Sequence, residues 1–198
     1  MQKKGITPEK IYQEATQLII EKGYDRFSVR ELAGRLDVQP ASLYSHVKNA
    51  AEISVAVGKN AIAQLSRTLE KATEKENREE AFIAMAHAYR NFAHENPELY
   101  KAIMALPGAS ETQLKEDEQK TIRPMRAAIE NFVPAGAPSI NFQRFVRSAM
   151  HGFIMLESEG FMRDKSISAD DSYDMLISAC LSALKEASVT SDVPGDAQ

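Results

Sequence analysis

The stretch FSVRELAGRLDVQPASLYSHVKN, residues 27–49, has the pattern of two short helices joined by a tight turn. Ser28 and Glu31 have the spacing of a capping box, in which each side chain accepts a hydrogen bond from the other residue's N–H. The first helix is expected to stop near Asp37, because Asp tolerates the left-handed conformation that ends many helices. The second helix begins at Gln39-Pro40, since proline at the first helical position lacks an N–H that would have no helical partner there.

The second helix divides into an apolar face and a polar face. Pro40, Leu43 and Val47 have i, i+3, i+7 spacing, which predicts that they face inward. The outward residues at its N-terminal end are small and polar, as in a helix that meets base edges in the major groove of DNA. Gln39 can form two hydrogen bonds with adenine, and Ser42 can donate or accept one. The alternative is an ordinary pair of core helices with a solvated face.

Residues 7–55 resemble the DNA-binding half of the TetR family of bacterial transcription regulators, whose signature runs close to ASLYSHVKN (41–49). Members often carry Lys at the position of Ala50, where it meets a phosphate; here that contact is missing or comes from Lys48. The resemblance implies contacts with double-stranded operator DNA, and the residues at these positions are Ser28, Arg30, Gln39, Pro40, Ala41, Ser42, Tyr44, Ser45, His46 and Lys48.

The composition is that of an ordinary globular protein with a large helical core. The chain has 198 residues, of which 43% are hydrophobic and 26% charged, and no apolar run approaches a membrane span. The single Cys180 excludes an internal disulfide, and no apolar h-region follows Lys3 and Lys4. We therefore expect a cytoplasmic protein without a signal peptide. The net charge is −4, yet residues 1–50 hold eight Lys and Arg against six Asp and Glu. This weak asymmetry would orient the N-terminal part toward phosphate.

The expected fold is all-α, with a three-helix N-terminal helix-turn-helix head, a long helix, and a C-terminal helical bundle. Thr7 and Gly23 suit the two ends of a first helix over 7–22. Further helices are predicted over about 28–37, 39–47, 50–72, 80–95, 97–105, 111–132, 140–159 and 170–187. We predict a DNA-binding domain at 1–50, a ligand-binding and dimerisation domain at 51–188, and a disordered tail at 189–198.

The C-terminal part resembles one subgroup of the same family, through YRNFAHENPELYKAIM (89–104) and MHGFIMLESEGFM (150–162). That subgroup (the WHG type) commonly has Trp before the His-Gly pair, whereas this chain has Met150 there and no Trp. The resemblance implies a pocket for a small apolar or aromatic effector. Its natural lining would be Met85, Tyr89, Phe92, Tyr100, Met104, Phe132, Phe145, Met150, Phe153 and Met155, although each of these could simply be a core residue.

The last two long helices carry small residues such as Ala149, Gly152, Ala179 and Ala183 along their apolar seams. One interpretation is a homodimer built from these two helices of each chain; the other is that both seams are buried within one subunit. A single helix-turn-helix makes few contacts, which favours the homodimer.

Three functions are compatible with these patterns. The first is a ligand-responsive DNA-binding regulator, most often a repressor in this family, that a small molecule releases from its operator through linkage. The second is an enzyme, although the sequence has no phosphate loop, nucleophile elbow or zinc motif. The third is a helical interaction protein that has lost specific DNA binding. We expect no metal, no cofactor and no membrane partner.

Overall fold

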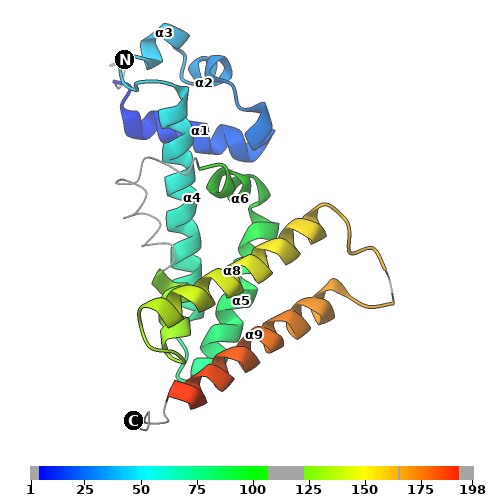
Figure 1. Ribbon diagram of the computed structural model, residues 1–198. Coiled ribbons are helices and arrows are strands. Elements are labelled where there is room, and N and C mark those ends of the chain that lie inside the picture. The colour runs from blue at the N-terminus through cyan, green and yellow to red at the C-terminus, as the bar shows by residue number, and fades with distance from the viewer. Residues whose placement is uncertain (1–4, 107–122, 165, 192–198) are drawn as a thin grey trace. The chain divides into compact units, whose positions relative to one another are not determined.

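The computed structural model describes residues 5–106, 123–164 and 166–191, and the regular elements in these ranges are all helical. The chain forms two compact units (Figure 1). The first unit comprises Met1–Leu65 with Phe92–Gln119, and the second comprises Ser66–Asn91 with Lys120–Gln198. Helices α4 (Ala50–Ala72) and α5 (Arg78–Glu95) each contribute residues to both units. The all-α fold expected from the sequence is therefore confirmed.

The first helix has the ends that its sequence predicts. Helix α1 spans Pro8–Lys22, and the Thr7 hydroxyl accepts a hydrogen bond from the Lys10 N–H at 3.3 Å. Gly23 ends the helix with φ of 100°, a conformation that costs glycine little. A single 3-10 turn, η1 (Tyr24–Arg26), follows and was not expected.

The helix-turn-helix differs from its prediction in two respects, the cap of its first helix and the length of its second. Helix α2 spans Val29–Arg35, but the Ser28 side chain makes no capping hydrogen bond. The predicted capping box is therefore wrong, and the Glu31 carboxylate lies 3.5 Å from the Lys22 ammonium of α1. Asp37 has φ of 55°, the left-handed conformation expected at this turn. Helix α3 spans only Pro40–Leu43, with the proline in its first turn, so the helix predicted over 39–47 is too long. Residues 44–46 form a turn, in which the His46 N–H donates to the Leu43 carbonyl at 2.9 Å.

Apolar residues of the first unit form one buried core beneath these helices. Helix α6 (Pro97–Met104) joins this core through Ala102, although it is far away in sequence. The Glu98 carboxylate accepts a 2.6 Å hydrogen bond from the Tyr24 N–H. The core comprises Ile11, Ala15, Leu18, Ile19, Leu32, Ala33, Leu43, Val47, Ile53, Val57 and Ala102. The head thus packs with the start of α4 and with α6 in a single unit.

The second unit is also helical. It contains most of α5, the helical residues 123–130, α8 (Ala137–Ser158) and α9 (Ala169–Ser191). Helix α8 begins three residues before its predicted start, because Pro138 stands in its first turn. Helix α9 continues to Ser191, so residues 189–191 are helical rather than part of a tail. The predicted helix over 111–132 lies largely outside the described residues, as does the rest of the predicted tail.

None of the helices in the described ranges is both long enough and apolar enough to cross a bilayer.

Candidate nucleic-acid interface

The polar tip of α3 is exposed. Gln39, Ser42 and Tyr44 are all solvent-accessible, and Tyr44 exposes 48% of its surface. Ser28 and Pro40 are half-buried, and the other predicted DNA contacts are exposed; these are Arg30, Ala41, Ser45, His46 and Lys48. The structure places all ten side chains on α2, on α3 and in the turns that flank them. Each individual contact with DNA stays a prediction.

The exposed tip rests on buried apolar side chains. Leu43 is fully buried and Val47 exposes 4%, and both belong to the core of the first unit. The Ser42 N–H donates to the Gln39 carbonyl at 2.9 Å, and the Ser45 hydroxyl donates to the Ser42 carbonyl at 2.7 Å. A surface hollow of about 350 Å³ lies beside Gln39 and Ser42 and is also lined by Gly34, Asp37 and Val38. The arrangement can offer hydrogen-bonding groups to a base edge while the backbone stays fixed.

The turn between α3 and α4 is held by Glu52, which the sequence patterns did not single out. The Lys48 N–H donates to Glu52 Oε2 at 2.7 Å, and the Tyr12 hydroxyl of α1 donates to Glu52 Oε1 at 2.8 Å. These two hydrogen bonds, the Lys48 bond first, lower the pKa of Glu52. The Glu52 N–H in turn donates to Asn49 Oδ1 at 2.9 Å. The Asn49-x-x-Glu52 spacing of a capping box was the available sequence signal.

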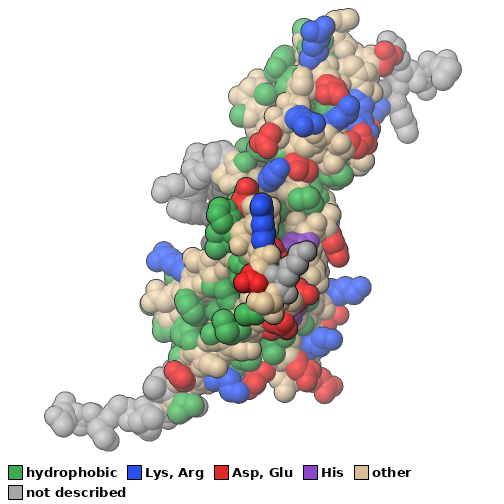
Figure 2. All heavy atoms as spheres, turned by 90° about the vertical axis from the view of Figure 1, so that its right-hand side faces the viewer, with side chains coloured by type: hydrophobic (Ala, Val, Ile, Leu, Met, Phe, Trp, Pro, Cys, Tyr) green, Lys and Arg blue, Asp and Glu red, His purple; other side chains and the backbone are tan. Residues whose placement is uncertain are grey.

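The charge of the first unit is locally balanced. Arg35 donates to Glu14 and Glu21 of α1 at 2.9 and 2.6 Å, so this guanidinium is engaged within the protein. The ion pair lowers the pKa of Glu21 to about 2. On the face drawn in Figure 2, Lys and Arg side chains are interspersed with Asp and Glu.

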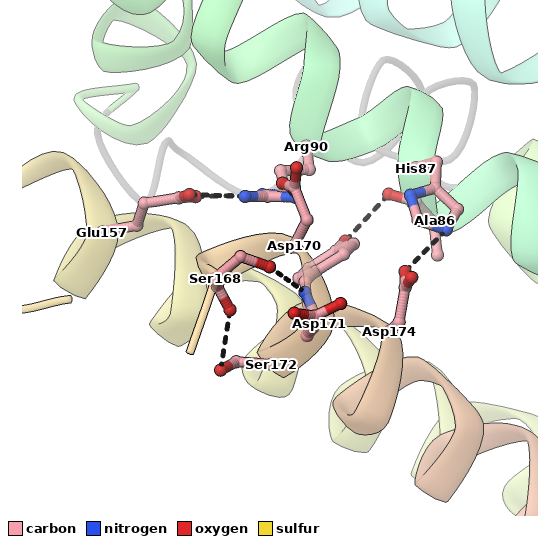
Figure 3. A network of polar contacts seen from close by, with 10 residues as sticks. Ala86, His87, Arg90, Glu157, Ser168, Asp170, Asp171, Ser172 and Asp174 are labelled. Carbon is pink, nitrogen blue, oxygen red and sulfur yellow. Dashed lines mark hydrogen bonds and ion pairs between the residues drawn. The ribbon is translucent and has the colours of Figure 1, made fainter. Parts of the chain in front are cut away.

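The second unit contains a buried ion-pair cluster that the sequence patterns did not indicate. Arg90 of α5 exposes 6% of its surface and lies between Glu157 of α8 and Asp170 of α9 (Figure 3). Its Nε donates to Glu157 at 3.0 Å, and its Nη1 donates to Asp170 at 2.8 Å. The guanidinium also lies 4.9 Å from the centroid of the Tyr173 ring. The Tyr173 hydroxyl donates to the Ala86 carbonyl at 2.8 Å.

The ten predicted pocket residues fall into three groups. Met85, Tyr89, Phe132, Met150 and Phe153 are buried in the second unit. Phe92, Tyr100 and Met104 belong to the first unit, where Met104 is only half-buried. Phe145 and Met155 expose 48% and 40% of their surfaces, so in the single chain they do not line an interior.

A surface hollow of about 350 Å³ in the second unit is lined by other residues, among them Lys75, Arg78 and Asn131. Among the described residues, no three His, Cys, Asp or Glu side chains converge in a way that could hold a metal ion.

Family models match both parts of the chain. The model for bacterial regulatory proteins of the tetR family matches residues 11–57. The model for the tetracyclin repressor-like C-terminal domain matches residues 82–180, which is half of the chain.

Known relatives agree with these matches. An HTH-type transcriptional regulator of Bacillus subtilis (strain 168), YobS, is 27% identical over 164 residues, covering 82% of this chain and 85% of that protein. A second HTH-type regulator, from Mycobacterium tuberculosis, is 28% identical over 160 residues, and the matched region covers 80% of this chain and 73% of that protein.

Solved structures show the same fold. The TetR family regulator PfmR of Thermus thermophilus is similar with a TM-score of 0.59 and 25% identity, covering 87% of this chain and 97% of that one. Apo ActR of Streptomyces coelicolor is similar with a TM-score of 0.72 at 14% identity, covering 94% of this chain and 98% of that one. With both family models matched, the chain belongs to the TetR family of DNA-binding transcription regulators.

Proposed function

We propose that this regulator is a repressor, which binds its operator as a homodimer and leaves the DNA when a small molecule binds. The observation that supports this most strongly is the geometry of α3, where Gln39 and Ser42 are exposed above a buried Leu43. Such an element can enter the major groove without rearrangement of its own core. The ten predicted side chains would supply base contacts at the tip and phosphate contacts around it.

The proposed dimer interface lies on α8 and α9. On α8, Phe145 and Leu156 expose 48% and 49% of their surfaces, and Gly152 has open space where a side chain would be. On α9, Met175 exposes 73%, and Ala179 is also exposed. Large apolar side chains beside small ones allow two helix pairs to pack closely across a two-fold axis. The helix-turn-helix heads of the two subunits would then bind two DNA half-sites whose separation is about one helical turn or a multiple of it.

The proposed effector is apolar or aromatic and binds among the buried Met, Tyr and Phe side chains of the second unit. A TetR variant from Acinetobacter baumannii AYE, whose fold is similar with a TM-score of 0.66, has been solved in complex with minocycline. Methionine and aromatic side chains form adaptable, polarisable walls for such ligands. We further propose that the C-terminal part belongs to the WHG-type subgroup, with Met150 in place of the usual tryptophan.

The test is binding of the full chain to the DNA upstream of its own gene, compared with an unrelated duplex of equal length across a salt series. We expect a Kd of about 10⁻⁸ M or tighter for the first duplex and a steep salt dependence. Equal affinity for both duplexes would contradict the proposed function. Release of the specific duplex by one member of a library of apolar and aromatic compounds would support the proposed effector class.

Two substitutions separate base contacts from phosphate contacts. We expect Tyr44→Ala to weaken binding to both duplexes by a similar factor, because a phosphate contact carries no sequence information. Gln39→Ala should reduce discrimination between operator and single-base variants by about 1–3 kcal/mol at the position it contacts. Gln13→Ala, which removes an exposed amide from α1, is the matched control and should leave both affinities unchanged.

A further inference from the structure

Resting on the proposed operator binding, we propose that Glu52 and Tyr12 are positioning residues that hold Lys48 at the DNA backbone. Lys48 then provides a phosphate contact just before α4, where position 50 is an alanine. Neither positioning residue need touch DNA. Their role is to fix the turn between α3 and α4, from which the Lys48 side chain extends into solvent.

The carboxylate of Glu52 joins three segments of the first unit. One oxygen accepts from Tyr12 of α1, and the other accepts from the backbone N–H of Lys48, which follows α3. Glu52 itself stands in the first turn of α4. Because both oxygens are engaged, the carboxylate fixes the distance and angle between the Lys48 backbone and α1. Hydrogen bonds to a charged acceptor are shorter and stronger than neutral ones.

This pattern differs from an ordinary helix cap. In a capping box the glutamate would accept from the N–H of the cap residue itself, here Asn49. Glu52 instead accepts from the preceding Lys48, while Asn49 accepts from the Glu52 N–H. Tyr12 lies forty residues earlier in the chain, so its hydrogen bond adds nothing to a local cap. The contacts are therefore arranged to fix a tertiary position as well as to begin α4.

The charges at this turn indicate where a phosphate can bind. Position 50 is an alanine, and the first turn of α4 carries the negative charge of Glu52. A carboxylate at a helix N-terminus occupies the favourable field that a phosphate would use. The start of α4 is thus a poor phosphate site, whereas the exposed Lys48 side chain, two residues before α4 begins, is placed for a phosphate of bound DNA.

The experiment measures operator affinity of the full-length variants Tyr12→Phe, Glu52→Gln and Lys48→Ala over a salt series. Charge alone predicts that Glu52→Gln binds DNA more tightly, because it removes a negative group near phosphate. Positioning predicts the opposite sign, a loss of about 3- to 10-fold. Tyr12→Phe keeps the ring and the net charge, and should show a loss of similar size. Lys48→Ala should lower the slope of log Kd against log salt by about 0.9.

A double-mutant cycle distinguishes positioning from a general loss of stability. In the Glu52→Gln background, Lys48→Ala should cost much less than it does in the wild type, because the lysine is already misplaced. Circular dichroism should show every variant fully folded at the assay temperature. Glu9→Gln, which removes an exposed carboxylate from α1, is the charge-matched control and should not weaken binding.

The proposal is overturned if Tyr12→Phe and Glu52→Gln bind the operator with the affinity and salt slope of the wild type. It is also overturned if the loss of binding free energy caused by Lys48→Ala is the same in those backgrounds as in the wild type. Either result leaves the proposed function intact as long as the wild-type chain still prefers its operator. Loss of that preference in the wild type would instead refute the proposed function.

Discussion

Replacing Arg90 by methionine tests how the buried cluster stabilises the second unit. The Arg90 side chain exposes 8% of its surface and that of Glu157 exposes 15%, whereas Asp170 exposes 81%. Removing the guanidinium takes away the two hydrogen bonds that Arg90 donates to the largely buried Glu157 carboxylate, and breaking a buried ion pair in this way costs about 3–5 kcal/mol of unfolding free energy. The exposed Asp170 pair is worth about 0–1 kcal/mol. We therefore expect Arg90→Met to be far more damaging than Asp170→Asn.

The double variant Arg90→Met with Glu157→Leu is the decisive comparison. It replaces a buried ion pair by two apolar side chains of similar volume, a change that is often neutral or stabilising. We expect its unfolding free energy to lie within about 1 kcal/mol of the wild type. Urea unfolding, monitored by circular dichroism at one fixed protein concentration, gives the unfolding free energies of the wild type, Arg90→Met, Asp170→Asn and the double variant.

Two outcomes would refute this reasoning. If Asp170→Asn costs as much as Arg90→Met, the exposed pair carries the stability and burial is irrelevant. If the double variant is no more stable than Arg90→Met alone, the loss comes from the guanidinium's packing against Tyr173 at 4.9 Å, not from the broken ion pair with Glu157.

The remaining predictions concern close packing, the dimer and pH. Gly58→Ala should destabilise the chain by about 1 kcal/mol in thermal unfolding, because the new methyl would lie 2.6 Å from Leu106 Cγ and the overpacking outweighs the gain in helix propensity. In Gly152→Leu the new side chain would enter open space in the single chain, so we expect the variant to fold like the wild type but to be a monomer by light scattering. A dimeric variant would contradict the proposed interface on α8 and α9. Arg35 lowers the folded-state pKa of Glu21 to about 2, so the stabilisation that Glu21 provides is present above pH 4.5 and is lost as the pH falls toward 2. In Glu21→Gln, the unfolding free energy should change less between pH 4.5 and pH 2 than in the wild type.

Local sequence signals predicted the elements that depend on neighbouring residues. The ends of α1 at Thr7 and Gly23 follow from capping preferences, and α4 has the predicted bounds. The left-handed Asp37 follows from the short turn that must join two helices. Ser28 shows the limit of such signals. Its capping box has the right spacing, but the Ser28 side chain makes no capping hydrogen bond, and the Glu31 carboxylate lies near Lys22 of another helix, which local spacing does not reveal.

The contacts that the sequence did not predict join residues distant along the chain. Tyr24 and Glu98 are separated by 74 positions, and Arg90 and Asp170 by 80. Polar side chains in amphipathic helices are usually solvated, so nothing in the periodicity of α5 distinguished Arg90 from an ordinary surface arginine. Burial of a charged group becomes apparent only when the partner helices are in place.

The recognition element itself depends on such distant contacts. Helix α3 spans only Pro40–Leu43, and an isolated helix of that length is unstable in water. Its conformation is maintained by Leu43 and Val47 in the core of the first unit and by the turn that Glu52 holds. Sequence therefore predicts which side chains are exposed at the tip of α3, but contacts with α1 and α4 fix the backbone that carries them. It follows that substitutions beneath the tip should alter operator affinity even though they contact no nucleotide.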